Sequence, residues 1–547
     1  MIIALAQLNY HIGNFEQNTA KIIRTIHAAR DQGADLVVFA ELAIGGYPAK
    51  DLLRSDAFLT ACQQSLLQIA EQSLGIACII GVPLPNTTGR GKALFNAAAF
   101  LAEGKVQQIV NKGLLPDYDI FDEYRYVHPA VKHHCISYQG HRIALTICED
   151  LWNAVEPKLY AGSPMDKLRE EHPDIIINIA ASPFSYSHQQ ERIAVLQGEA
   201  RRSKLPLLYL NQVGAHTDII FDGRSIILSD EGELVDTMAP FEEDIRYYRF
   251  ESNDITPLQK RSDLQQPDEV ALIYQALLLG IRDYFKKSGF TRAVVGLSGG
   301  IDSAVVAALA CEALGPENVM AVLMPSVYSS DHSISDALDL VHYTGCLHEI
   351  IPIQPIAEAF NDQLTTAFKG LSQDITEENI QARIRGTVLM AMANKHGYIL
   401  LNTSNKSEAA VGYGTLYGDM AGALGVIGDV YKTQVYQLAH YINRDRVLIP
   451  HNTLVKPPSA ELRPDQQDSD SLPEYALLDA VLFQYIEHEK SAEQLVGLGF
   501  EPALVNRILR LVNQAEFKRF QSPPILRISN KAFGGGRVMP LVAKYPL

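Results

Sequence analysis

The chain has 547 residues and a formal net charge of −16, with 47% hydrophobic and 20% charged residues. A single hydrophobic core does not grow to that length, so two or more domains are expected, and the composition is that of a globular protein. The acidic balance disfavours a nucleic-acid-binding groove, and no apolar run in the sequence is long enough to span a bilayer.

The six cysteines follow neither a metal-ligand spacing nor the spacing of a disulfide framework. They are typical of reduced thiols, which predicts a cytoplasmic location. The first fifteen residues lack a basic segment and are interrupted early by Gln7 and Asn9. They therefore predict a first strand and not a signal peptide.

Short apolar strands alternate with helical stretches through residues 1–250. Several of these runs are apolar on both faces, as in sheets that are covered on each side. The pattern predicts an α/β layered domain. The predicted strands cover residues 2–7, 36–40, 77–82, 97–102, 143–147, 175–179, 207–211 and 225–229, and a helix covers residues 14–32.

Three polar residues, Glu41, Lys112 and Cys148, stand just past predicted strand ends. Taken singly, they fit a capping acid, a solvated lysine and an inert core thiol. Taken together they fit nucleophilic catalysis. An ammonium group would lower the pKa of a nearby thiol and stabilise an anionic tetrahedral intermediate, while a carboxylate would carry the thiol proton to a leaving amine.

These residues lie in the motifs ELAIGGYP (41–48), NKGLLPDYDIFDE (111–123) and ICEDLW (147–152), which resemble the nitrilase/amidase superfamily. The resemblance implies an α-β-β-α sandwich that hydrolyses a C–N amide bond through a thioester. It makes Glu41 the general base, Lys112 the stabiliser of the intermediate and Cys148 the nucleophile.

The same resemblance implies that glutamine is the amide substrate. Tyr118 and Ser182, the latter in NIAASPF (178–184), fall where the glutamine-using members hold it. Those members usually carry Lys or Arg six residues after the serine, and this chain departs from them with His188. Glu123 is expected to be a supporting carboxylate.

Residues 251–268 are polar, contain two prolines and lack apolar periodicity, so they predict a linker to a second domain at 269–547. Strands and helices alternate again there, which predicts a doubly wound parallel sheet with a nucleotide at the carboxyl ends of its strands. The predicted strands cover residues 293–297, 319–324, 348–352 and 398–402, and the predicted helices cover residues 269–287 and part of 379–395.

The turn SGGIDS (298–303) follows the first of these strands and precedes an alanine-rich helix. Two glycines let the backbone approach a ligand, and the first helical turn offers free N–H groups to a phosphate. Asp302 beside polyphosphate calls for a divalent cation between them. The alternative is a plain strand–helix turn capped by Asp302. The motif resembles the pyrophosphate loop of the ATP-pyrophosphatase superfamily, which implies adenylation of a carbonyl or carboxylate oxygen.

Further motifs resemble the family of glutamine-dependent NAD⁺ synthetases: ENIQARIRG (378–386), NTSNKSE (402–408), GDVYKTQVY (428–436), PPSAEL (457–462) and NKAFGGGR (530–537). The resemblance implies Mg²⁺ held by Asp302 and Glu408, and no redox cofactor. The residues it implies for ATP are Gly296, Leu297, Ser298, Gly299, Gly300, Ile301, Asp302, Ser303, Thr403, Lys432 and Ser459. Those it implies for deamido-NAD⁺ are Asn379, Arg383, Glu408 and Lys531.

The expected reaction is therefore amidation of deamido-NAD⁺ with ammonia released from glutamine. The partners are then small molecules, with no nucleic acid or membrane, and the chain is expected to form a homo-oligomer. One rival is another glutamine-fed ATP-pyrophosphatase acting on a different carboxylate; the other is a nucleotide-binding regulatory protein with both centres inactive. Residues 461–474, which are acidic and contain prolines, predict either a lid or a solvated loop.

Overall fold

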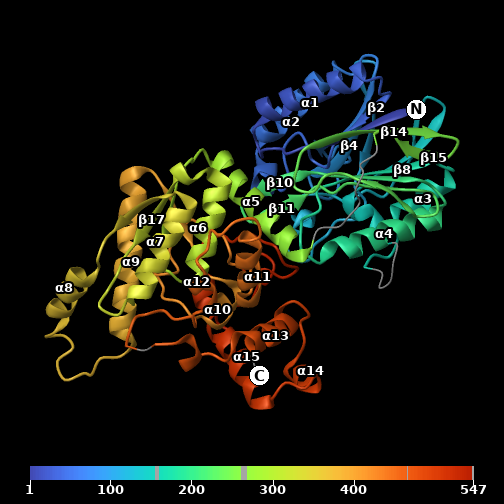
Figure 1. The fold of residues 1–547 in the computed structure, drawn as a ribbon. Helices are drawn as coiled ribbons and strands as arrows, with labels where there is room; N and C mark the ends of the chain where they lie inside the picture. Colours follow the sequence, from blue (N-terminus) through green and yellow to red (C-terminus); the bar gives the residue numbers. More distant parts are fainter. Residues whose placement is uncertain (154–158, 260–267, 465, 545–547) are drawn as a thin grey trace. The chain divides into compact units, whose positions relative to one another are not determined.

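The computed structural model describes residues 1–153, 159–259, 268–464 and 466–544 (Figure 1). The chain divides into two compact units, Met1–Gln266 and Pro267–Leu547. None of the helices among the described residues is both long and apolar enough to cross a membrane.

The first unit contains two sheets that share one core (Figure 1). Their strand orders are β15-β14-β1-β2-β3-β4-β5 and β13-β12-β9-β8-β7-β6. The first sheet consists of β1 (Ile2–Gln7), β2 (Leu36–Val38), β3 (Ala77–Pro85), β4 (Leu94–Ala102), β5 (Lys105–Asn111), β14 (Asp244–Glu251) and β15 (Asp254–Pro257). The second consists of β6 (Ile136–Tyr138), β7 (His141–Ile147), β8 (Ile175–Ala180), β9 (Leu207–Asn211), β12 (Ile226–Leu228) and β13 (Leu234–Thr237), and β10 (Val213–His216) pairs with β11 (Ile219–Asp222).

Strand β1 shows why the unit is layered, because its side chains alternate between two cores. Ile3 and Leu5 pack into the cluster between the sheets, whereas Ala4 and Ala6 face the cluster beneath the helices. The helices of this unit are α1 (Phe15–Asp31), α2 (Asp56–Ala70), α3 (Pro164–Glu170) and α4 (His188–Ser203). Helices α1 and α2 add residues to the outer core of the first sheet, and α4 contacts β9 and β12 of the second. The predicted α-β-β-α sandwich is confirmed.

The second unit contains a parallel sheet with the strand order β18-β17-β16-β19-β20. Its strands are β16 (Ala293–Gly296), β17 (Val319–Leu323), β18 (Leu347–Ile350), β19 (Ile399–Asn402) and β20 (Leu424–Gly425). Because β16 pairs with both β17 and β19, the strand order reverses there. The loops after β16 and β19 therefore diverge around a crevice, which is where doubly wound sheets bind ligands. The predicted parallel sheet is confirmed.

Helices surround this sheet and extend into a carboxy-terminal helical cluster (Figure 1). Helix α6 is buried along most of its length, which explains its run of small apolar residues after the SGGIDS turn. The helices are α5 (Glu269–Ser288), α6 (Ile301–Leu314), α7 (Asp331–Thr344), α8 (Gln354–Leu364), α9 (Ile375–His396), α10 (Lys406–Val411), α11 (Lys432–Ile442), α12 (His451–Val455), α13 (Tyr475–Ile486), α14 (Ala492–Gly497), α15 (Pro502–Gln514) and α16 (Glu516–Arg519).

The structure changes the interpretation of residues 251–268. Strand β15 lies inside this predicted linker and pairs antiparallel with β14. Ser252 and Asn253 connect the two strands with φ values of 51° and 63°. A two-residue hairpin turn of type I′ needs positive φ at both central positions, and asparagine tolerates it well. The sequence did not reveal this hairpin because strand β15 is mostly polar. The part of the predicted linker at residues 260–267 lies outside the described residues.

Candidate active sites

In the first unit the structure brings together the three residues that follow strand ends. Lys112 Nζ lies 2.7 Å from Glu41 Oε1, and both side chains are almost fully buried. Glu123 accepts two further hydrogen bonds from Lys112, of 2.8 and 2.9 Å. Asn96 donates to Glu41 Oε1 at 2.7 Å, and the Ala181 N–H donates to Glu41 Oε2 at 2.9 Å. Glu41 is therefore held by three donors.

Cys148 begins the short helix η3 (Cys148–Leu151) with φ 43°, a left-handed conformation that is costly for a residue with a side chain. Asp150 fixes this turn by accepting from the N–H groups of Ile147, Gly113 and Leu114 at 2.8–3.0 Å. The same carboxylate thus anchors the segment after Lys112 to the segment that carries the thiol.

The electrostatic balance at the thiol differs from the expectation. Burial and the Glu41 carboxylate raise the pKa of Cys148 well above its usual value, and Lys112 only partly opposes them. Lys112 does lower the pKa of Cys148, as predicted, but burial and Glu41 outweigh it, so the net pKa is raised. The main physical reason is the burial of the thiol, and the two carboxylates that engage Lys112 also offset its charge. The resting thiol keeps its proton and needs a base to remove it.

Tyr118, one of the two predicted substrate residues, contacts a carboxylate that the sequence analysis did not select, Glu149. Its side chain is buried and accepts hydrogen bonds from Tyr118 at 3.1 and 3.2 Å and from Tyr160 at 2.9 Å. Burial raises the pKa of Glu149 to about 7. The only signal for it in the sequence was its place directly after the nucleophile. A carboxylate in this position could hold an ammonium group.

Ser182 follows β8 and is pinned by Asn211, which accepts from its N–H at 2.8 Å and donates to its carbonyl at 3.0 Å. His188, the residue that departs from the family pattern, starts α4. Its ring stacks on Trp152 with the centroids 5.0 Å apart and the planes 3° from parallel. His188 Nδ1 also lies 3.2 Å from Glu191.

In the second unit the SGGIDS turn is closed by its own hydroxyl groups. Ser298 Oγ and Ser303 Oγ are 3.1 Å apart, and the Gly300 N–H donates to Ser298 Oγ at 3.2 Å. Gly299 has φ 82°, and a Cβ atom on it would lie 2.2 Å from the Ser333 carbonyl oxygen. Only glycine therefore permits the close approach of this turn to α7.

Asp302, at the start of α6, is paired with Lys432, which starts α11. Asn405 donates to the other oxygen of Asp302 at 2.9 Å, and Glu408 Oε1 lies 3.6 Å from Lys432 Nζ. Burial and the Asp302 carboxylate raise the pKa of Glu408 to about 8. Although burial alone would lower the pKa of Lys432, the Asp302 and Glu408 carboxylates raise it above its usual range. The site holds two carboxylates around one buried ammonium group.

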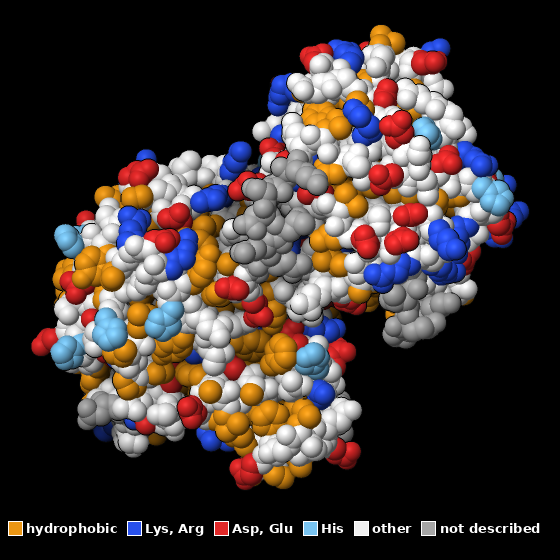
Figure 2. All heavy atoms as spheres, turned by 45° about the vertical axis from the view of Figure 1, so that its right-hand side comes forward, with side chains coloured by type: hydrophobic (Ala, Val, Ile, Leu, Met, Phe, Trp, Pro, Cys, Tyr) orange, Lys and Arg blue, Asp and Glu red, His pale blue; other side chains and the backbone are white. Residues whose placement is uncertain are grey.

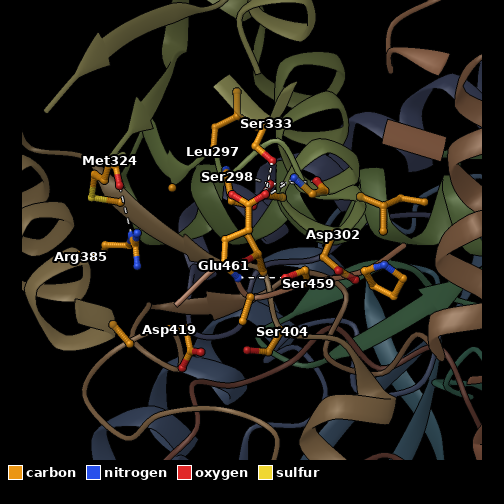
Figure 3. Close-up of a pocket in the computed structure, with 18 of the residues that line it drawn as sticks. Leu297, Ser298, Asp302, Met324, Ser333, Arg385, Ser404, Asp419, Ser459 and Glu461 are labelled. Carbon is orange, nitrogen blue, oxygen red and sulfur yellow. Dashed lines mark hydrogen bonds between the residues drawn. The ribbon is translucent and has the colours of Figure 1, made fainter. Parts of the chain in front are cut away.

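A cavity of about 300 Å³ opens beside this turn (Figure 3). Most of the residues predicted to contact ATP or metal line it: Gly296, Leu297, Ser298, Gly300, Ile301, Asp302, Ser303, Thr403, Glu408, Lys432 and Ser459. The cavity is large enough for a nucleotide-sized ligand to enter at least in part. The loops after β16 and β19 thus meet at one cavity, as their strand order predicts.

Three of the residues predicted to bind deamido-NAD⁺ make contacts within the protein and not with the cavity. Asn379 Oδ1 accepts from Thr415 Oγ1 at 2.7 Å, and Arg383 Nε donates to the Leu416 carbonyl at 3.2 Å. Lys531 Nζ lies 3.0 Å from the exposed carboxylate of Glu489. None of the three is among the described residues that line the cavity.

Arg385, two residues along α9 from Arg383, does line the cavity and donates to the Met324 carbonyl at 3.2 Å (Figure 3). Burial lowers its pKa to about 10. The segment ARIRG offered both arginines, and helix periodicity alone could not decide which one faces the sheet. Asp419 also lines the cavity and was not predicted.

The segment 456–462 forms one wall of the cavity. Glu461 accepts from Ser333 Oγ at 2.7 Å and from Ser330 Oγ at 2.9 Å, so it bonds to the first turn of α7 (Figure 3). Asp468 is buried and accepts from Tyr413 at 3.1 Å and Tyr475 at 2.9 Å. At these positions the segment 461–474 is therefore packed on the fold, which favours the lid over the solvated loop; residue 465 lies outside the described residues.

Family models match each unit separately. Residues 2–260 match the model described as carbon-nitrogen hydrolase, and residues 273–522 match the model described as NAD synthase. Together with the two sites, these matches define a carbon–nitrogen hydrolase joined to an NAD synthase. Full-length relatives carry both parts in the same order.

A glutamine-dependent NAD(+) synthetase of Synechocystis sp. is 44% identical over 99% of both chains, and one of Acinetobacter baylyi is 40% identical over 99% of this chain and 98% of its own. The solved structure of the glutamine-dependent NAD+ synthetase from Acinetobacter baumannii with ADP is 36% identical, covers 99% of this chain and 98% of that one, and has a TM-score of 0.78. The chain belongs to the family of glutamine-dependent NAD(+) synthetases.

Proposed function

We propose that this protein converts deamido-NAD⁺ to NAD⁺, with ATP split into AMP and pyrophosphate and with glutamine as the nitrogen donor. The observation that carries the proposal is that one chain holds both centres: the buried Glu41–Lys112–Cys148 set and the SGGIDS turn beside a cavity. The family supports deamido-NAD⁺ over another carboxylate, since the relatives match over the whole length. In this proposal residues 1–250 are the amidase and residues 269–547 the synthetase.

In the amidase half, Glu41 takes the proton of Cys148, and the thiolate attacks the side-chain amide carbon of glutamine. Lys112 stabilises the negative charge that develops on the carbonyl oxygen. Glu41 returns the proton to the leaving nitrogen, so ammonia departs and a thioester remains. Water then hydrolyses the thioester to glutamate and restores the thiol.

Glutamine itself is held through its charged end in this proposal. The Glu149 carboxylate, with Tyr118 donating to it, is suited to the α-ammonium group. A carboxylate with a pKa of about 7 is half charged at pH 7 and largely charged above it, and a bound ammonium group would lower that pKa and favour the charged form.

In the synthetase half, a carboxylate oxygen of deamido-NAD⁺ attacks the α-phosphorus of ATP and pyrophosphate leaves. Ammonia then attacks the activated carbonyl carbon, and AMP leaves with the bonding electrons. The turn from Ser298 to Ser303 and the first turn of α6 offer N–H and hydroxyl donors to the phosphates. Lys432 supplies a positive charge, and Arg385 lies on the same cavity.

We further propose that Asp302 and Glu408 hold Mg²⁺ together with ATP. The two carboxylates share one ammonium group, and the raised pKa of Glu408 indicates that its negative charge is poorly compensated. A divalent cation would supply the missing positive charge and, when bound, would neutralise charge on the leaving pyrophosphate. The expected cytoplasmic location and homo-oligomer stay predictions, the latter open to light scattering.

The direct test is incubation of the purified full-length protein with deamido-NAD⁺, Mg-ATP and glutamine. NAD⁺, AMP, pyrophosphate and glutamate should form in equal amounts. Turnover of another carboxylate in a substrate panel, with none of deamido-NAD⁺, would reject the proposed substrate. Absence of both glutamate and AMP would reject both activities.

A further inference from the structure

Two cysteines of the second unit meet at the far ends of the two helices that begin beside the SGGIDS turn. Cys311 lies in the last turn of α6, and Cys346 follows α7 and directly precedes β18. The fold brings them together because only residues 315–318 separate α6 from β17, and the start of β18 pairs with the start of β17. The side chains of Cys311 and Cys346 are hydrogen-bonded to each other.

This hydrogen bond makes the two thiols chemically unequal. Cys311 donates to Cys346, which holds the pKa of Cys346 below its usual value although burial opposes this, and the same bond raises the pKa of Cys311. Burial raises the pKa of the other four cysteines, all in the first unit. Among the six cysteines, which all lie in the described ranges, Cys346 is therefore the most readily deprotonated. The thiolate is the form that reacts with oxidants.

The pair lies just beneath the surface of the second unit. Cys311 is 7% exposed and Cys346 is 5% exposed, and each is followed in the chain by an exposed residue, Glu312 and Leu347 respectively. A small oxidant such as a peroxide can reach thiols at this depth, whereas a bulky disulfide reagent is excluded. Two thiols in hydrogen-bond contact need only a short closure to reach the bonding distance of a disulfide.

Helices α6 and α7 connect this pair to the proposed ATP site. The two helices contact each other (Figure 1). Asp302 precedes Cys311 by nine residues on α6, which is about 14 Å along the helix axis. The first turn of α7 contains Ser333, whose carbonyl oxygen abuts Gly299 of the SGGIDS turn. Well-packed interiors transmit strain, so drawing the far ends of the helices together shifts the groups at their starts.

We propose that Cys311 and Cys346 are a redox-sensitive pair, which a peroxide oxidises to a disulfide that weakens ATP binding in the second unit. The effect on ATP rests on the proposed function; formation of the disulfide does not. Oxidation would tie together the ends of α6 and α7, and reduction by a dithiol would release them.

The oxidation proceeds in two steps. The Cys346 thiolate attacks one oxygen of hydrogen peroxide, the O–O bond breaks, and a sulfenic acid forms while hydroxide leaves and takes up a proton. The Cys311 sulfur then attacks the Cys346 sulfur, so that an S–S bond forms and the remaining oxygen leaves as water with the Cys311 proton. The two thiols lose two electrons in all, and the peroxide is reduced to two molecules of water.

The test measures the disulfide and ATP binding separately on the full-length protein. After treatment with one equivalent of hydrogen peroxide, the remaining thiols are alkylated in denaturant and the peptides are mapped by mass spectrometry. The number of free thiols should fall from six to four, with a linked pair of peptides that contain Cys311 and Cys346. The Kd for Mg-ATP, measured by calorimetry, should rise at least about fivefold, the lower end of typical coupling between sites, and should recover with dithiothreitol.

Cys346→Ala and Cys311→Ala each remove half of the pair, so both should bind Mg-ATP like the reduced wild type before and after peroxide treatment. Either variant suffices if the other does not fold. Cys135 is a half-buried thiol of the first unit, and Cys135→Ala is the matched control that should form the disulfide as the wild type does.

Three results would overturn the inference: six free thiols after peroxide treatment, a sulfinic acid at Cys346 without a disulfide, or a disulfide that leaves the Kd for Mg-ATP unchanged. Equal weakening of ATP binding by peroxide in Cys346→Ala would overturn it as well, because another residue would then be responsible. A reduced wild-type protein that binds no Mg-ATP would instead reject the proposed function, and the peptide map would still decide whether the disulfide forms.

Discussion

Lys112 Nζ lies 2.7 Å from Glu41 Oε1, in a buried pair whose members are 71 positions apart in the sequence. Because Glu123 binds the same ammonium group, Lys112 remains charged while its effect on Cys148 is limited. Burial and Glu41 raise the pKa of the thiol. The raised pKa keeps the thiol neutral, so in the proposed mechanism proton transfer from Cys148 to Glu41 must precede attack.

Replacing Cys148 with alanine should separate the two activities. Glutamine-dependent NAD⁺ formation should fall by at least about 10³-fold, as for other lost nucleophiles, while synthesis with added ammonium salt should persist. Glutamate and NAD⁺ are measured in parallel. Cys135→Ala is the control. Cys135 directly precedes β6 and has no part in the proposed site, so this variant should keep both activities. Loss of ammonia-supported synthesis in Cys148→Ala would contradict this division.

Asp302→Asn should abolish AMP and pyrophosphate formation with either nitrogen source. The amide keeps the shape of the side chain but removes the charge that pairs with Lys432 and would hold Mg²⁺. Glutamate release by the first unit provides the internal control. A variant that formed AMP at the normal rate would show that Asp302 does not act with the metal.

Burial raises the pKa of Glu149 to about 7, which predicts that glutaminase activity falls at acidic pH. Below pH 7 the carboxylate gains a proton and can no longer attract the α-ammonium group. kcat/KM for glutamine should therefore fall about tenfold per pH unit there. Glu149→Gln should have a low kcat/KM that does not show this fall below pH 7. A wild-type profile that is flat from pH 5 to 7 would be incompatible with the role given to Glu149.

The pKa of about 8 at Glu408 predicts that Mg²⁺ binding is coupled to proton release. Below pH 8 a proton must leave this carboxylate when the cation binds, so the Mg²⁺ concentration for half-maximal AMP formation should rise as pH falls from 8. Glu408→Gln should need more Mg²⁺ at every pH and should lose this dependence. A half-maximal concentration that did not change with pH in the wild type would refute the coupling.

Gly299→Ala should damage the second unit selectively. The added Cβ would lie 2.2 Å from the Ser333 carbonyl oxygen, and the φ of 82° is unfavourable for alanine. We expect a loss of at least about 2 kcal/mol in the stability of this unit and loss of ATP-dependent AMP formation. Gly289→Ala is a control for φ alone, since it has a similar φ of 78° and nothing within 4 Å. Equal losses of stability and of AMP formation in the two variants would show that the contact with α7 is unimportant.

Strand ends were the most informative feature of the sequence. The apolar runs of β7 and β16 could be recognised because both faces of these strands are covered, and the residues that follow them, Cys148 and Ser298, could be placed with them. Hairpin β14–β15 could not be recognised in this way, because its second strand lacks an apolar pattern. Which arginine of α9 faces the cavity also depended on packing that periodicity does not specify.

By itself, the sequence determined the two α/β units, the order of their motifs and the kinds of side chain at each centre, because strand periodicity and strand-end chemistry are local properties of the chain. Only the tertiary structure decided how these groups act on one another. It placed Glu123 on Lys112 and Glu149 between two tyrosines. Such effects depend on burial and on contacts between residues far apart in the chain, and local sequence carries no information about either.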